Sequence, residues 1–179
     1  MQTLAFAASN SLNSINKALL QHAANVLRAE IMDTEIELFS VRDFDLPIYC
    51  IDTENEMGIP EPAQALFEKI GAADQLLFAF AEHNGSYTAG YKSLFDWMSR
   101  IETKVFQAKP MVALATSPGG GGARNVLGQF ETSAPHFKAD LKATFSAPKF
   151  YDVFDSNVGQ LTDAELQVSL RSALSAFKQ

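Results

Sequence analysis

The chain has a single cysteine, Cys50, among its 179 residues. One cysteine can form no disulfide within the chain and supports no cysteine-based metal framework. Long apolar runs are also missing, since no stretch approaches the roughly 18 apolar residues that a membrane helix needs. The first ten residues, MQTLAFAASN, place no charged region ahead of a long apolar core. We therefore expect a soluble, unprocessed, cytoplasmic protein without a membrane partner.

Positive charge is scarce as well. Lys and Arg number 14 against 21 Asp and Glu, which gives a formal net charge of −7. A nucleic-acid footprint needs clustered Lys and Arg, and none occurs, so we expect no DNA or RNA partner. The histidines, His22, His83 and His136, show no metal-ligand spacing, and we predict no metal site. No serine lies in a GxSxG elbow, which disfavours hydrolysis.

The apolar residues that are present gather in short runs. Hydrophobic residues make up 47% of the chain, an ordinary value for a globular protein, and the length suits one domain over residues 1–179. The runs are continuous and do not alternate, which is typical of strands covered by helices on both faces. Three runs are clear and two are weaker: 3–8, 74–81 and 110–116, then 34–40 and 142–147.

Helical periodicity separates these runs. Residues 15–30, 93–101 and 162–178 place apolar side chains three and four positions apart, as one face of a helix requires. Thr162 and Glu165 have the spacing of a capping box, so we predict that the last helix starts at Thr162. Residues 40–60 have no clear periodicity, and we predict a long loop there. The alternation of strands and helices predicts a three-layer α/β sandwich around a mostly parallel sheet.

Ligands of such sheets bind at the carboxyl ends of the strands, so the segments after the three clear strands form the candidate site. The first, SNSLNSIN at 9–16, gathers hydroxyls and amides where a strand meets a helix. Hydroxyls, backbone N–H groups and the helix dipole can bind a phosphate there without a positive side chain. The alternative is that Ser14 only caps the helix and the rest is a polar turn.

The third segment, SPGGGGAR at 117–124, contains four consecutive glycines. Glycines let the backbone approach a flat ligand and present N–H groups to it, although such a run also suits a flexible connection. The segment lacks the Gly-Lys-Ser or Gly-Lys-Thr of a P-loop and the spacing of a dinucleotide fingerprint.

The middle segment, EHNGSYTAG at 82–90, carries His83, which is either a general acid or base or simply a hydrogen-bonding group. On the helix that follows, Lys92 and Asp96 are four residues apart, which favours a surface ion pair. We place Trp97 in the core.

Together these segments resemble the NADPH-dependent FMN reductase family, flavodoxin-like proteins that include quinone, azo-dye and chromate reductases. Residues 8–16 are similar to the family motif G-S-x-R-x-x-S-x-N, with Ser11 in place of the arginine. AEHNGSYTAGYKSLFDW at 81–97 is similar to P-E-Y-N-x-S-x-P-G-x-L-K-N-x-x-D-W, with His83 in place of the tyrosine. The glycine segment and LPIYCID at 46–52 also match, so the resemblance spans nearly the whole chain.

The resemblance implies a flavodoxin-like fold with a five-stranded parallel sheet in the order 2-1-3-4-5 and FMN at the switch point. The FMN phosphate would lie on the first segment and the isoalloxazine ring between the other two. The implied cofactor contacts are Ser9, Ser11, Ser14, Asn16, Ala81, Glu82, His83, Asn84, Ser117, Pro118, Gly119, Gly120 and Gly121.

The implied activity is that of an FMN-dependent oxidoreductase. A hydride passes from NADPH or NADH to FMN, and the electrons then pass to a small acceptor: a quinone, free flavin, azo compound or metal oxyanion. The cofactor carries the chemistry, so we predict no catalytic side chain. The changes at Ser11 and His83 bear on FMN affinity and on the choice of nicotinamide.

Two other functions fit the same residues. One is a non-enzymatic FMN-binding electron carrier or flavin-dependent regulator, and the other is an α/β domain whose loops bind a different phosphate compound. Relatives in the family are commonly dimers or tetramers, so we expect a homodimer or homotetramer. Tyr87 and Tyr91 suit either such an interface or local packing.

Overall fold

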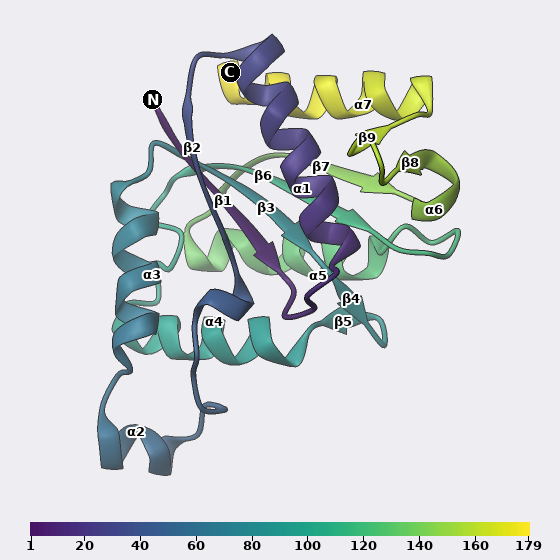
Figure 1. Cartoon of the computed structure of the whole chain (residues 1–179). Coiled ribbons are helices and arrows are strands. Elements are labelled where there is room, and N and C mark those ends of the chain that lie inside the picture. Colours follow the sequence, from purple (N-terminus) through teal and green to yellow (C-terminus); the bar gives the residue numbers. More distant parts are fainter.

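A five-stranded sheet lies between two layers of helices in the computed structural model, which describes residues 1–179 (Figure 1). The strand order is β2-β1-β3-β6-β7, and every neighbouring pair is parallel. The strands are β1 (Gln2–Ala8), β2 (Glu35–Ser40), β3 (Gln75–Phe80), β6 (Pro110–Thr116) and β7 (Asp140–Ala147). All five predicted strands are confirmed. So is the flavodoxin-like order 2-1-3-4-5, once these strands are numbered along the chain.

The helices cover both faces of this sheet. Their bounds are α1 (Ile15–Val26), α2 (Ile51–Met57), α3 (Glu61–Ala72), α4 (Ala89–Ile101), α5 (Arg124–Ser133), α6 (Phe150–Val153) and α7 (Ala164–Ser175). Two small antiparallel pairs are added, β4 (Glu82–His83) with β5 (Ser86–Tyr87) and β8 (Phe154–Asp155) with β9 (Gln160–Leu161). No helix has both the length and the apolar composition that crossing a membrane requires.

Two local predictions are wrong. The segment 40–60 is not one long loop, because it contains α2, a helix that buries none of its residues and lies apart from the sheet (Figure 1). The last helix does not begin with a Thr162 cap. Asp163 caps α7 instead, its side chain accepting the N–H of Leu166 at 2.9 Å. Asp is preferred over Thr at the N-cap position, and its carboxylate is the stronger acceptor, so the helix begins one position later.

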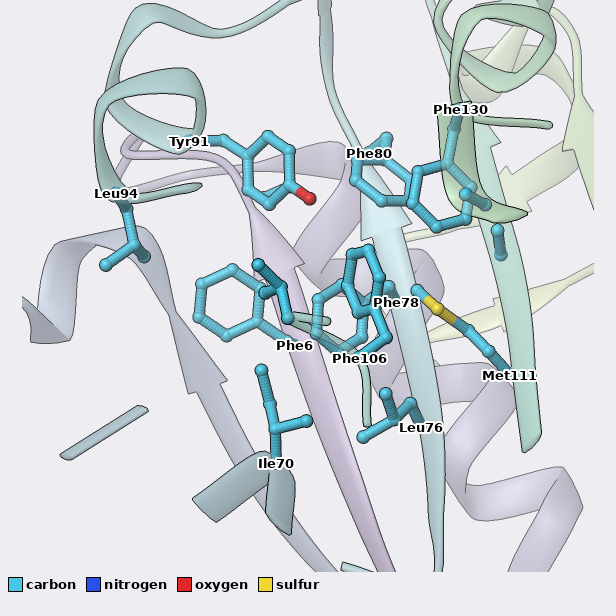
Figure 2. Packing of buried hydrophobic residues seen from close by; sticks show 14 of the residues in the cluster. Phe6, Ile70, Leu76, Phe78, Phe80, Tyr91, Leu94, Phe106, Met111 and Phe130 are labelled. Atoms are coloured by element: carbon cyan, nitrogen blue, oxygen red, sulfur yellow. The ribbon is translucent and has the colours of Figure 1, made fainter. Parts of the chain in front are cut away.

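The two faces of the sheet bury different side chains, because successive strand residues point to opposite sides. Toward α1 and α7 the central strands present mainly Ala and Leu. Toward α3, α4 and α5 they present Phe6, Phe78 and Phe80, which pack on helix residues such as Tyr91 (Figure 2). Trp97 is fully buried in this aromatic layer, as predicted. The packed layers hold the carboxyl ends of β1, β3 and β6 in place, where the three candidate segments begin.

Candidate functional site

The first segment turns tightly from β1 into α1, and its serines fix that turn. Ser9 is buried, and its Oγ accepts the N–H of Ser11 at 3.4 Å. Ser14 Oγ accepts the N–H of Lys17 at 3.2 Å and so caps α1, as the alternative interpretation proposed. Ser9 and Ser14 act here as acceptors, so their hydroxyl protons remain available to a ligand oxygen. The first turn of α1 contains no acidic residue, which leaves its positive dipole end favourable for an anion.

Asn16 anchors this segment to the end of β6. Its buried side chain donates through Nδ2 to the Thr116 carbonyl at 3.0 Å, and its Oδ1 accepts the Thr116 N–H at 2.9 Å. Thr116 Oγ1 donates to the Ala147 carbonyl at 2.6 Å. On the other side, Thr88 Oγ1 donates to the Ala8 carbonyl at 3.3 Å. The Asn16 bonds hold the first segment beside the end of β6, where the third begins, and the Thr88 bond ties the middle segment to the end of β1.

The middle segment, expected as a loop after a strand, contains a small hairpin. Asn84 and Gly85 form its two-residue turn with φ angles of 53° and 76°, and the Asn-Gly pair is itself a strong hairpin signal. The Glu82 carboxylate turns toward the start of α5, where it accepts the N–H of Val126 at 3.0 Å and a proton of the Asn125 amide at 3.2 Å. The hairpin is therefore tied to the helix that follows the glycine segment.

Side chains around this hairpin divide between surface and core. His83 is exposed, and the predicted surface ion pair is confirmed, with Lys92 Nζ 2.7 Å from Asp96 Oδ1. Tyr91 is buried against the ring of Phe80, so local packing accounts for it. Burial also raises the pKa of the Tyr91 phenol well above its usual value, and the hydroxyl stays neutral.

The four glycines after β6 fall into two groups. A Cβ on Gly122, whose φ is +61°, would lie 2.3 Å from Ser146 Oγ and 3.0 Å from Pro148 N, so the fold itself requires glycine there. A Cβ on any of Gly119 to Gly121 would meet nothing within 4 Å. The N–H groups of these three form no backbone hydrogen bond. The chain gives no steric reason for three consecutive glycines, but a ligand lying against their backbone would.

A cationic side chain from a distant part of the sequence also reaches this edge. Arg42, just after β2, donates through Nη1 to the Asn10 carbonyl at 3.0 Å. No local pattern indicates this contact, since 32 residues separate the two positions. Cavities flank the first segment on both sides. One of about 520 Å³ is lined by Asn10, Arg42 and Gly90, and one of about 650 Å³ by Ser14 and Tyr151 among others.

The predicted site residues thus come together at one edge, on three segments joined by hydrogen bonds. The sheet is parallel and has this strand order, with a hydroxyl-rich turn and a glycine-rich loop at its switch point. This arrangement is typical of flavodoxin-like proteins. A model of the NADPH-dependent FMN reductase family matches residues 1–150, and the chain belongs to that family. The predicted family is confirmed. The description of the family names reduction of FMN by NADPH, and relatives of the chain are named as quinone oxidoreductases and an FMN reductase.

Relatives with known names agree with this assignment. An NAD(P)H:quinone oxidoreductase of Solanum tuberosum is 31% identical over 172 residues, which cover 92% of this chain and 84% of that protein. A quinone reductase of Escherichia coli is 37% identical over 81 residues, 45% of this chain, and the match spans 43% of the relative's length.

Solved structures support the fold. FerB, a flavoenzyme NAD(P)H:(acceptor) oxidoreductase from Paracoccus denitrificans, has a TM-score of 0.75 at 24% identity, covering 98% of this chain and 94% of that one. An FMN-dependent NADH-azoreductase from Bacillus anthracis, solved in complex with FMN, has a TM-score of 0.62 at 13% identity, with 99% and 98% covered.

Proposed function

We propose that the chain binds FMN at the carboxyl edge of its sheet and uses it to pass electrons from NADPH or NADH to a small acceptor. The observation that carries this proposal is that two loops with available hydrogen-bond donors lie at the switch point of the sheet. One is a hydroxyl-rich helix start without acidic residues, and the other is a run of three glycines with free N–H groups. Asn16 and Thr116 link the two through hydrogen bonds of 3.0 and 2.9 Å.

The donors at this edge fit the two ends of FMN. The hydroxyls of Ser9, Ser11 and Ser14 and the first N–H groups of α1 suit a phosphate, which accepts but does not donate hydrogen bonds when fully ionised. The second Nδ2 proton of Asn16 adds a donor, while its first proton holds β6. A flat ring system suits the glycine loop, because Gly119 to Gly121 present backbone without side chains.

The remaining contacts would come mainly from backbone. Ala81 is buried at the end of β3, and the Glu82 carboxylate is turned toward α5, so the segment Ala81 to Asn84 would meet the ring through its main chain and the His83 side chain. Ser117 and Pro118 would complete the opposite wall. N–H groups of the two segments would stabilise negative charge on the ring.

The chain's part in the reaction is therefore binding and orientation. When bound, FMN supplies the hydride acceptor and the onward electron transfer, so no acid or base from the chain is required. Specificity for the acceptor would depend on the shape of the open site, which suits small molecules.

The proposal extends to the domain organisation, the cellular compartment and the oligomeric state. We assign residues 1–179 to one domain, since α7 packs against β7 in the same core as α1. The exposed thiol of Cys50 suits a reducing compartment, the cytoplasm. We also propose a homodimer or homotetramer, in which the half-buried Tyr87, beside a cavity of about 240 Å³ between α4 and α5, would lie at the interface.

An anaerobic spectrum tests the proposal. The purified protein is reconstituted with FMN, unbound flavin is removed, and NADH and NADPH are added in separate cuvettes. Bleaching of the flavin bands, followed by recovery on addition of a quinone, is the expected result. Retained flavin that neither nucleotide bleaches would replace the reductase by an electron carrier or regulator. A protein that retains no flavin would overturn FMN binding itself.

A further inference from the structure

The turn after β2 holds Arg42 in a defined position at the carboxyl edge. Ser40 and Asp43 close this turn, because the Asp43 carboxylate accepts the Ser40 N–H at 2.6 Å and the Ser40 hydroxyl at 3.1 Å. Val41 is buried beneath it. The backbone of Arg42 is therefore fixed beside the end of β1. The position of the guanidinium then depends only on the conformation of the side chain.

The guanidinium lies over the first segment without a charged partner. Its Nη1 donates to the Asn10 carbonyl at 3.0 Å, one residue from Ser9 and one from Ser11. Arg42 takes part in none of the ion pairs of the chain, and the adjacent Asp43 carboxylate is occupied by Ser40. A guanidinium carries five N–H donors, so one bond to a carbonyl leaves several for a second acceptor.

A phosphate bound by the first segment would be held more tightly with such a charge beside it. Residues 9–16 contain no Lys or Arg, and the chain as a whole carries a formal charge of −7. The dipole of α1 supplies only about half an elementary charge, against the charge of about −1.5 to −2 on a phosphate monoester. Serine hydroxyls contribute hydrogen bonds but no net charge. A cation from another part of the chain would correct this imbalance.

We propose that Arg42 is the cationic partner of the FMN phosphate and takes over the charge that Ser11 does not supply. This inference rests on the proposed function, because it assumes that the first segment binds FMN. Arg42 reaches the segment from the turn after β2, the neighbour of β1 in the sheet. The bond to the Asn10 carbonyl orients the guanidinium, and its remaining donors pair with phosphate oxygens in the forked geometry that arginine favours.

Titrations with two flavins test this role. FMN and riboflavin share the ring and the ribityl chain, and only FMN carries a phosphate. Binding of each to the apoprotein is followed by quenching of flavin fluorescence for the unchanged chain, Arg42→Gln and Arg42→Lys. Arg28→Gln is the matched control, since Arg28 is exposed, lies after the far end of α1 and loses the same charge.

Arg42→Gln is expected to weaken FMN binding about tenfold or more, the size of a lost charge-assisted hydrogen bond, and to leave riboflavin binding within about twofold. Added salt should weaken FMN binding less in this variant than in the unchanged chain. Arg42→Lys should restore part of the affinity, and Arg28→Gln should change neither flavin.

The other outcomes each have a distinct meaning. Equal weakening of FMN and riboflavin would make Arg42 a brace of the loop and overturn the proposal, and so would unchanged FMN affinity. An Arg42→Gln variant that binds FMN normally but is reduced less readily by NADPH, and no less readily by NADH, would assign the charge to the nicotinamide phosphate instead. If the unchanged chain binds no FMN, the proposed function fails before Arg42 is tested.

Discussion

The first segment and the glycine segment reach the same edge of the sheet but are shaped in opposite ways. Side-chain hydrogen bonds from Ser9, Ser14 and Asn16 hold the first. In the glycine segment the chain's own packing demands glycine only at Gly122, and main-chain bonds to the Ser117 and Gly119 carbonyls hold the rest. The comparison separates residues that hold the site together from glycines that leave space for a ligand. Substitutions in the first group should lower stability, and substitutions in the second should lower FMN affinity.

The largest effect is expected within the glycine run. Gly122→Ala should lower the free energy of unfolding by roughly 2 to 4 kcal/mol, because its Cβ would collide with Ser146 and Pro148 at a positive φ. Gly120→Ala is the matched control and should change stability by less than about 0.5 kcal/mol while weakening FMN binding. Chemical denaturation and flavin titration measure the two quantities. Equal stability of the two variants would contradict the distinction between Gly122 and the three glycines before it.

Asn16→Ala should come next, with a loss of about 2 to 3 kcal/mol in unfolding free energy. The change leaves the buried N–H and carbonyl of Thr116 without their side-chain partner. Asn13→Ala removes an exposed amide from the same segment and should cost less than about 0.5 kcal/mol. Thermal unfolding without flavin isolates this structural role. If Asn16→Ala lost no more stability than Asn13→Ala, the proposed stabilising role of the link to β6 would be wrong.

Ser14→Ala should weaken FMN binding by about 1 kcal/mol, the usual contribution of one neutral hydrogen bond. It should also destabilise the fold by about 1 kcal/mol, since Ser14 caps α1. Asp163→Ala removes the cap of α7 and serves as the control that loses stability but keeps its flavin affinity. FMN affinity that stays unchanged in Ser14→Ala would remove this hydroxyl from the phosphate site.

The smallest effect on binding is expected at the hairpin. His83→Tyr should alter turnover with NADH or NADPH more than it alters FMN retention, because the side chain is exposed where it would border the ring. Stopped-flow reduction and flavin titration give the two values. A parallel loss of both would place His83 in FMN binding instead of in the reductive step.

Local sequence predicted most of this architecture. Apolar runs marked all five sheet strands, and helical periodicity marked α1, α4 and α7. These patterns are local, because the side chains that a helix or strand buries recur along the sequence with the period of that helix or strand. The Asn84-Gly85 pair is also a local hairpin signal, which the sequence analysis did not use. The exposed helix α2 buries no side chain, so it left no apolar periodicity to detect.

The sequence by itself determined the order of strands and helices, the three loops of the site and the family to which the chain belongs. Only the tertiary structure decided how those loops are joined. Asn16 meets Thr116 across 100 residues, Glu82 meets Val126 across 44, and Arg42 meets Asn10 across 32. Each contact arises because a parallel sheet brings the ends of distant strands to one edge, and no repeat along the chain records which side chains meet there.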